Sequence, residues 1–179
     1  MALFTSTATV QAQSPAPATS SKVLVVFFSH SGNTREIARQ IQTASGADLF
    51  EIEPVAAYPT DYDAVVAQAK KELNTNFRPA IKSAGPDLAG YDTIFVGSPN
   101  WWSTIAPPVM TFLETRNFAG KTLIPFITHE GSRMGRSEQD VKRLCPGATV
   151  TDGRAFPGPA VKRAAGEVRG WLRELKLRK

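Results

Sequence analysis

The sequence has little cysteine and histidine, which limits the kinds of site that it can build. Its 179 residues include one cysteine, Cys145, and two histidines. A single cysteine excludes an internal disulfide and any metal site made of several thiolates, and two histidines argue against a histidine-rich metal site. We therefore predict no metal site. We expect Cys145 to be a buried thiol at the end of a helix.

The sequence also lacks long apolar runs and several common catalytic motifs. No stretch has the roughly 20 apolar residues that a membrane-spanning helix needs, so no transmembrane segment is expected. The P-loop pattern, the G-x-S-x-G elbow and the glycine fingerprint of dinucleotide folds are all missing. The length and the 42% hydrophobic content instead fit one domain with a full core.

The net charge of +5 comes entirely from the last 20 residues. Apolar residues recur there at helical spacing, so we predict a packed terminal helix with a basic outer face. That face is either simply solvated or a docking patch for an acidic partner or a membrane surface. A nucleic acid partner is not expected, because no aromatic residues interleave with the charges. The basic residues are Lys162, Arg163, Arg169, Arg173, Lys176, Arg178 and Lys179.

Residues 1–21 differ from the rest in being rich in Ser, Thr, Ala, Gln and Pro and in carrying no charge. This composition predicts a disordered tail before a single domain over residues 22–179. The tail could equally be the remnant of an export signal, since Val10-Gln11-Ala12 resembles a small-residue cleavage site. The compartment, cytoplasmic or periplasmic, therefore stays open.

After the tail, strand and helix patterns alternate along the chain. Strands are predicted at residues 23–28, 48–53, 93–97, 122–127 and about 149–152, and helices at about 34–44, 62–74, 106–116, 136–144 and 159–175. Five such repeats predict a parallel sheet covered by helices on both faces, a three-layer α/β/α sandwich. Pro125 conflicts with its strand, because proline cannot donate to the ladder.

Three loops follow predicted strands at the edge where open parallel sheets bind ligands. The first loop, residues 29–34, ends the apolar run of VLVVFFSHSGNT (residues 23–34). It suits a phosphate at a helix N-terminus, although the same residues are ordinary helix caps. The second loop, residues 98–104, contains Trp101 and Trp102, which either pack on the core or offer a surface for a flat ring. The third loop, residues 128–135, has glycines that let backbone N–H groups meet the polar edge of such a ring.

Together these segments resemble the flavodoxin-like family, specifically its short bacterial FMN-binding members. The resemblance rests on FFSHSGNT (27–34), YPTDYDAVVAQAKKELNTNFRPAI (58–81), YDTIFVGSPNWWSTIAPPV (91–109) and PFITHEGSRMGRS (125–137). It covers about residues 22–158. It implies a five-stranded parallel sheet of order 2-1-3-4-5 and a non-covalent FMN.

The resemblance also assigns residues to the cofactor. The FMN phosphate goes to Ser29, His30, Ser31, Gly32, Asn33 and Thr34. The isoalloxazine ring goes to Pro99, Asn100, Trp101 and Trp102 on one side and to Thr128, His129, Glu130 and Gly131 on the other. Tyr58 and Tyr62 either border the pocket or belong to the scaffold. No catalytic side chain is predicted, because the flavin would be the reactive group.

Three functions remain open from the sequence. The first is an electron carrier that works with an unknown redox protein. The second is an NAD(P)H-dependent flavin reductase that passes electrons to a quinone or similar small acceptor. The third is a non-redox domain that binds another phosphorylated ligand or a protein. The domain lacks the acidic excess that the family resemblance implies for docking on basic reductases.

Overall fold

The structure is a computed structural model that describes residues 22–177. The tail or signal remnant predicted for residues 1–21 lies outside the described residues. Within residues 22–177, no helix has the length and apolar character needed to cross a membrane.

One sheet organises the described chain, and its strand order confirms the prediction. The parallel strands lie in the order β2-β1-β3-β5-β6, β7 also pairs with β5, and β4 pairs antiparallel with β3. The short β6 and β7 share the position of the predicted fifth strand. The strands are β1 (Lys22–Phe27), β2 (Asp48–Glu51), β3 (Tyr91–Trp101), β4 (Thr104–Ile105), β5 (Thr122–His129), β6 (Thr149–Val150) and β7 (Arg154–Pro157).

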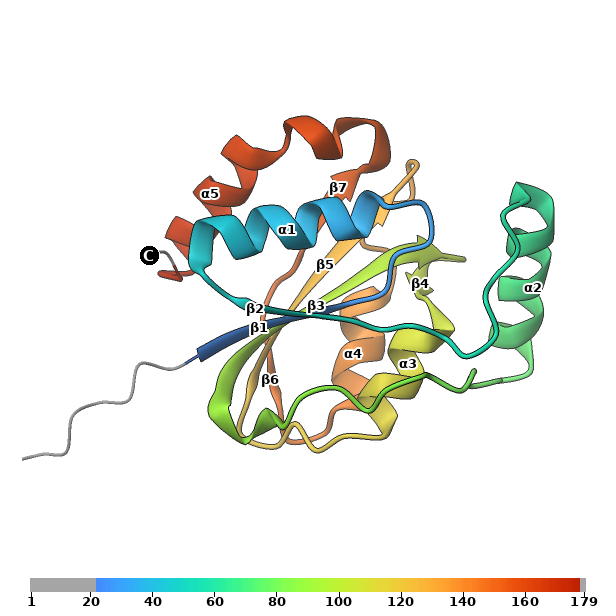
Figure 1. The fold of residues 1–179 in the computed structure, drawn as a ribbon, viewed down its shortest axis with the longest axis horizontal. Helices are drawn as coiled ribbons and strands as arrows, with labels where there is room; N and C mark the ends of the chain where they lie inside the picture. Colours follow the sequence, from blue (N-terminus) through green and yellow to red (C-terminus); the bar gives the residue numbers. More distant parts are fainter. Residues whose placement is uncertain (1–21, 178–179) are drawn as a thin grey trace, which may run out of the picture.

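Helices cover both faces of this sheet, as the three-layer prediction required (Figure 1). Helices α1 and α5 lie side by side on one face, whereas α3 and α4 lie on the other and α2 stands apart beyond β4. The helices are α1 (Asn33–Ser45), α2 (Tyr62–Asn74), α3 (Pro107–Glu114), α4 (Ser137–Leu144) and α5 (Ala165–Glu174), with short 3-10 turns η1 (Leu88–Gly90) and η2 (Gly158–Arg163). Cys145 is buried at the end of α4, as expected.

Alternation along the strands divides the core between the two helical layers. In β1, Val25 and Phe27 pack with α1 and α5, whereas Leu24 and Val26 pack on the opposite side with α3. Successive strand side chains point to opposite faces, so a strand that is apolar at every position must be covered on both sides. The continuous apolar run in the sequence therefore places β1 at the centre of the sandwich, with its carboxyl end feeding the first loop.

Pro125 explains why the fifth strand is split in two. The N–H of Thr151 donates to Leu123 O of β5, so Leu123 faces this neighbouring strand. Pro125, two residues on, faces the same side but has no N–H to offer. β6 pairs with β5 before Pro125 and β7 pairs with it afterwards. The conflict seen in the sequence is thus resolved by a break in the neighbouring strand rather than in β5.

The helix predicted over residues 159–175 begins later than expected. The 3-10 turn η2 occupies its first part, and the N–H of Ala164 donates to Val161 O. The Gln40 side chain of α1 also donates to that carbonyl, at 2.8 Å. A continuous α-helix would need Val161 O for Ala165 N–H, so both bonds favour the tighter turn.

Candidate functional site

The three predicted loops lie together at the carboxyl ends of β1, β3 and β5 (Figure 1). All the residues predicted to hold a cofactor therefore belong to one edge of the sheet. A hydrogen bond joins the first and third loops, because Thr34 Oγ1 lies 2.8 Å from Thr128 Oγ1. Both threonines are buried.

The first loop leaves the start of α1 open. Gly32 is the N-cap with φ +91°, so the N-cap residue has no side chain with which to bond the first N–H groups of the helix. Ser29 Oγ accepts from Arg35 N–H at 3.2 Å, while the N–H groups of Asn33 and Thr34 have no partner within the described residues. Unpaired N–H groups and the positive end of the helix dipole together favour an anion at this position.

Neither the guanidinium of Arg35 nor the imidazole of His30 is directed to that anion position. Arg35 makes a bidentate pair with Glu51 of β2, with Nε and Oε2 2.8 Å apart. The hydrogen bond to Glu51 raises the pKa of Arg35. His30 Nε2 lies 2.7 Å from Pro59 O, which ties the first loop to the segment before α2. An anion here would depend on backbone N–H groups.

The second loop is a tight β-hairpin rather than the open loop that the sequence suggested. Asn100 and Trp101 pair with Ile105 and Thr104. The two residues between these pairs, Trp102 and Ser103, have φ values of 53° and 65°. Such two-residue turns favour Asn and Gly, because left-handed backbone costs other residues about 1–2 kcal/mol each. Strain of this kind commonly occurs at binding sites.

The two tryptophans of this hairpin point into different surroundings. Trp101 packs edge-on against Tyr58 and Phe28, with ring centroids 4.9 and 5.5 Å apart. Trp102 remains 48% exposed, donates from Nε1 to Val66 O of α2 at 3.1 Å and lies under Lys70. One tryptophan is thus a fixed wall, and the other is an exposed ring at the edge of the site.

The third loop is shaped by His129. Its Nδ1 accepts from the N–H of Gly131 at 2.9 Å, and Gly131 has φ +140°. Burial lowers the pKa of His129. The charge of Glu130 partly opposes this shift, and the charge of Arg133 adds to it. The neutral imidazole is therefore favoured, and this is the form that can accept the hydrogen bond.

The second and third loops are packed backbone to backbone. A Cβ placed on Gly135 would lie 2.4 Å from Ser103 O, and that carbonyl accepts from Arg136 N–H at 2.8 Å. Asn100 Nδ2 donates to Arg133 O at 2.7 Å, which adds a second bridge. Asn100 Oδ1, by contrast, is buried without a partner within the described residues. An unpaired buried acceptor costs free energy, so it fits a ligand that brings a donor.

Two residues that the sequence reasoning missed also belong to this region. A Cβ on Gly158 would lie 2.0 Å from Glu130 Oε1 and 2.7 Å from Asn33 Nδ2, so η2 closely approaches side chains of the first and third loops, which a larger residue would displace. Glu72 of α2 is buried and accepts from the hydroxyl of Tyr58. Burial raises the pKa of Tyr58 most, and the hydrogen bond to Glu72 raises it further. Tyr62, by contrast, is 74% exposed.

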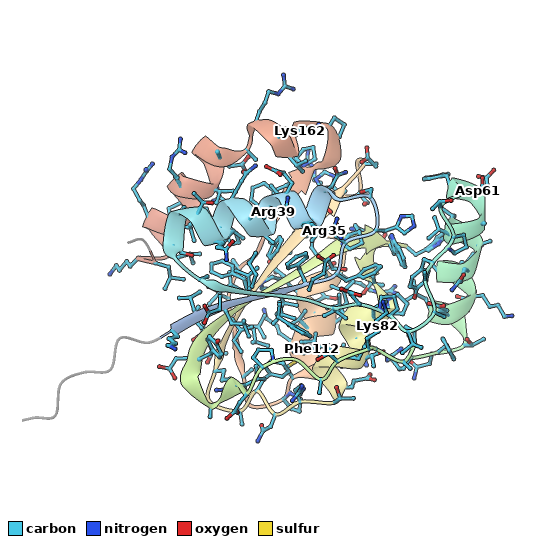
Figure 2. The ribbon with its side chains drawn as sticks, in the orientation of Figure 1. Arg35, Arg39, Asp61, Lys82, Phe112 and Lys162 are labelled. Carbon is cyan, nitrogen blue, oxygen red and sulfur yellow. The ribbon has the colours of Figure 1, made fainter. Side chains whose placement is uncertain are left out.

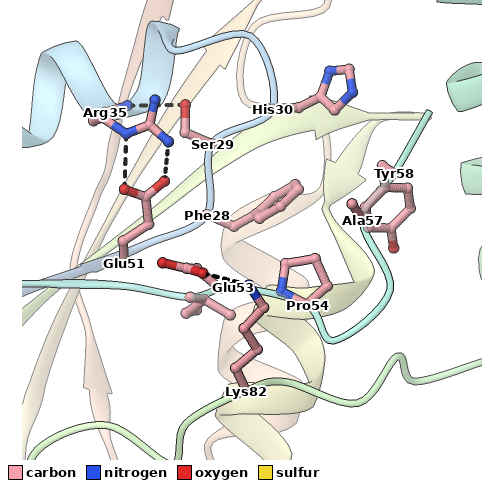
Figure 3. Close-up of a pocket in the computed structure, with 11 residues that line it drawn as sticks. Phe28, Ser29, His30, Arg35, Glu51, Glu53, Pro54, Ala57, Tyr58 and Lys82 are labelled. Atoms are coloured by element: carbon pink, nitrogen blue, oxygen red, sulfur yellow. Dashed lines mark hydrogen bonds and ion pairs between the residues drawn. The ribbon is translucent and has the colours of Figure 1, made fainter. Parts of the chain in front are cut away.

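A cavity of about 300 Å³ lies next to the first loop on its β2 side (Figure 3). Its charged groups are already paired, Arg35 with Glu51 and Lys82 with Glu53 at 2.9 Å. Tyr58, on which the half-buried Trp101 packs, contributes to its wall. Within residues 22–177, no group of three or more His, Cys, Asp or Glu side chains is arranged to hold a metal ion.

Comparison with known proteins identifies the family. The family model described as Flavodoxin matches residues 22–175. A comparison with curated proteins finds no significant match.

Solved structures agree with that family. A protein from Bacteroides eggerthii, provisionally named a flavoprotein, is 32% identical, with a TM-score of 0.77 over 88% of this chain and 99% of that one. A second such protein, from Bacteroides uniformis, is 33% identical, with a TM-score of 0.74 over 86% and 98%. A flavoprotein in complex with FMN from Lactobacillus acidophilus shares the fold at 23% identity, with a TM-score of 0.66 over 80% and 98%. The chain belongs to the flavodoxin family.

Proposed function

We propose that the protein binds FMN non-covalently and transfers electrons through it. The observation that carries this proposal is the convergence of three loops, a helix start with a glycine N-cap and an unpaired buried amide oxygen at one edge of the sheet. Solved flavodoxin-like proteins of the same fold are described as FMN complexes. A bound flavin can accept or donate one or two electrons, and its protein surroundings set the potentials.

The first loop would hold the phosphate. The N–H groups of Asn33 and Thr34 point from the start of α1, and Gly32 leaves open space where a side chain would stand. Hydrogen bonds to a charged group contribute about 1.5–3 kcal/mol each. We therefore expect FMN to bind at least about tenfold more tightly than riboflavin, which has no phosphate.

The second and third loops would enclose the ring. Residues 99–102 supply the aromatic wall, and residues 128–131 supply backbone groups held by the His129 turn. Asn100 Oδ1 would accept a hydrogen bond from the ligand and so gain the partner that it lacks. Poorly hydrated aromatic walls disfavour a charged ring, so these residues would shift its potentials.

One observation favours a reductase over a simple carrier. Trp102 and Tyr62 are exposed aromatic residues on the hairpin and on the helix that it contacts, 48% and 74% accessible. They leave an apolar surface on which a second planar molecule, such as a nicotinamide or a quinone, can stack. In this second candidate function, NAD(P)H would reduce the flavin directly.

A titration of the purified protein with FMN tests the proposal. We expect flavin fluorescence to be quenched at one equivalent, with weaker binding of riboflavin. Rapid loss of the flavin absorbance after anaerobic addition of NADPH would identify a reductase, whereas loss only with dithionite would identify a carrier. Flavin fluorescence that stays unquenched when FMN is mixed with excess protein would refute flavin binding and favour a non-redox domain.

A further inference from the structure

One helical layer of the molecule carries its net positive charge. Helices α1 and α5 pack side by side through Ile37, Ile41, Val168 and Leu172, so their other sides face solvent (Figure 1). Residues 33–45 and 154–177 contain eight cations and three carboxylates, whereas the remainder of residues 22–177 has eleven cations and thirteen carboxylates. We call the exposed cations of this layer the basic face; they are Arg39, Lys162, Arg163, Arg169, Arg173 and Lys176.

The nearby carboxylates do not neutralise the basic face. Glu174 pairs with Arg154 at 2.9 Å, and Glu167 lies 4.0 Å from the same guanidinium. Glu36 accepts from the side chain of Gln40. Within the described residues, no cation of the basic face lies within 4 Å of a carboxylate oxygen. Arg39 lies on α1, and Lys162 projects away from the body (Figure 2).

The basic face begins beside the candidate flavin site. Lys162 and Arg163 belong to η2, which follows β7 at the carboxyl edge of the sheet. The first residue of η2, Gly158, lies against Asn33 of the first loop and Glu130 of the third. A partner bound on this face would therefore also lie close to the site.

The surface chemistry favours a soluble protein as the partner. Helices that bind membranes combine basic residues with exposed apolar residues that enter the lipid. The exposed large apolar residues of the described chain, Val55, Tyr62, Phe77 and Trp102, all lie outside α1, η2 and α5. A face that is helical and cationic, without large exposed apolar or aromatic residues, fits the acidic surface of another protein, where charge complementarity sets register and association rate.

We infer that the basic face binds the acidic surface of a soluble protein partner. That this partner exchanges electrons with the protein rests on the proposed function, but the binding itself does not. A fluorescent oligo-glutamate peptide serves as the probe of an acidic surface, with the full chain as purified. We expect saturable binding that weakens steeply with salt, and amide chemical-shift changes confined to α1, η2 and α5.

Two matched variants test the location. The Lys162→Glu/Arg173→Glu variant reverses two cations of the basic face. The Lys71→Glu/Lys142→Glu variant reverses two exposed lysines on α2 and α4 and changes the net charge equally. We expect the first variant to weaken peptide binding at least about tenfold and the second to change it less than about twofold. Circular dichroism should show both variants folded.

Other results would overturn the inference. Equal weakening in both variants would mean that the peptide senses only net charge. Tighter binding to phosphatidylserine vesicles or to duplex DNA than to the peptide at the same salt would mean that the face serves a membrane or a nucleic acid. Because none of these measurements requires FMN, their failure is distinguishable from failure of the proposed flavin site.

Discussion

The two ends of the sheet use left-handed backbone in different ways. At the amino end, Gly46, Gly120 and Gly147 take positive φ values in the turns that lead into β2, β5 and β6. At the carboxyl end Gly32, Gly131 and Gly135 do so as well, but the β3–β4 hairpin places two successive non-glycine residues, Trp102 and Ser103, in this conformation. The other such residues of the described chain, Asn76, Arg133 and Lys176, occur singly. Glycine adopts this conformation at no steric cost, whereas other residues are strained by it.

This difference separates turns that follow local sequence preferences from a turn that does not. The amino-end turns follow the ordinary preference for glycine after a helix or before a strand. The carboxyl-end hairpin departs from it, and the same end has a helix start with a glycine N-cap and an unpaired Asn100 Oδ1. Departures from local rules that gather in one place are expected at functional sites.

The largest effect should come from adding a methyl group where two carboxyl-end loops touch. Gly135→Ala would place Cβ 2.4 Å from the backbone oxygen of Ser103, whereas Gly120→Ala at the amino end meets no atom within 4 Å. Both variants bear left-handed strain, but only the first also forces backbone apart. We expect losses in the free energy of unfolding of about 3 and about 1 kcal/mol, respectively. Urea denaturation measures both, and equal losses would contradict the packed loops.

A second pair of variants separates ligand binding from backbone strain. Gly32 and Gly120 both have positive φ and open space around the Cβ position. Alanine at either position should destabilise the fold by about 1 kcal/mol. Only Gly32→Ala should also weaken FMN binding, by at least about tenfold, because its methyl group occupies the proposed phosphate position. Fluorescence titration measures this, and unchanged FMN affinity in Gly32→Ala would place the phosphate elsewhere.

Acid should affect the carboxyl end through His129. Its pKa in the folded protein is lowered from 6.5, so the neutral form is favoured by folding. The unfolded chain then binds the proton more readily, and the stability that His129 contributes is present above pH 6.5 and lost as pH falls below it. His129→Asn keeps an acceptor for Gly131 N–H, as in an Asx-turn, but does not titrate.

The measurement is the free energy of unfolding as a function of pH. We expect wild type to lose stability below pH 6.5 with a slope of no more than one proton from this group, and His129→Asn to show a shallower slope. Identical slopes would mean that the His129 turn does not depend on the neutral imidazole.

We expect the smallest effect from relieving the backbone strain of the β3–β4 hairpin. Ser103→Gly should relieve the left-handed backbone at φ 65° and stabilise the protein without ligand by up to about 1 kcal/mol. Thermal unfolding reports the change. A loss of stability would show that the hairpin is not strained at Ser103, which would weaken the contrast with the glycine turns.

Much of this architecture could be predicted from the sequence because its signals are local. The apolar run of β1 followed by small polar residues located the first loop. Alternating strands and helices predicted a parallel sheet covered on both faces, and the family resemblance implied its strand order. The separate surroundings of Trp101 and Trp102 agree with one ring packing inward and the other facing out. The cause is the turn, because Trp101 is the last paired residue of β3 whereas Trp102 lies in left-handed backbone.

Other features depended on contacts that are distant in sequence. Trp102-Ser103 does not resemble the Asn-Gly type of hairpin turn, so β4 was missed. Pro125 indicated a conflict, but not that the neighbouring strand would break. Glu72 on an amphipathic helix is expected at the surface, and its burial became apparent only with Tyr58 beside it.

Hydrogen–deuterium exchange with and without FMN tests the central claim most directly, because it reports which backbone amides the ligand protects. We predict that protection is confined to residues 29–34, 98–104 and 128–135, with Asn33 and Thr34 most affected, and that the amino-end turns exchange unchanged. Protection centred on the amino end or on the cavity beside β2, or none at saturating FMN, would contradict the site.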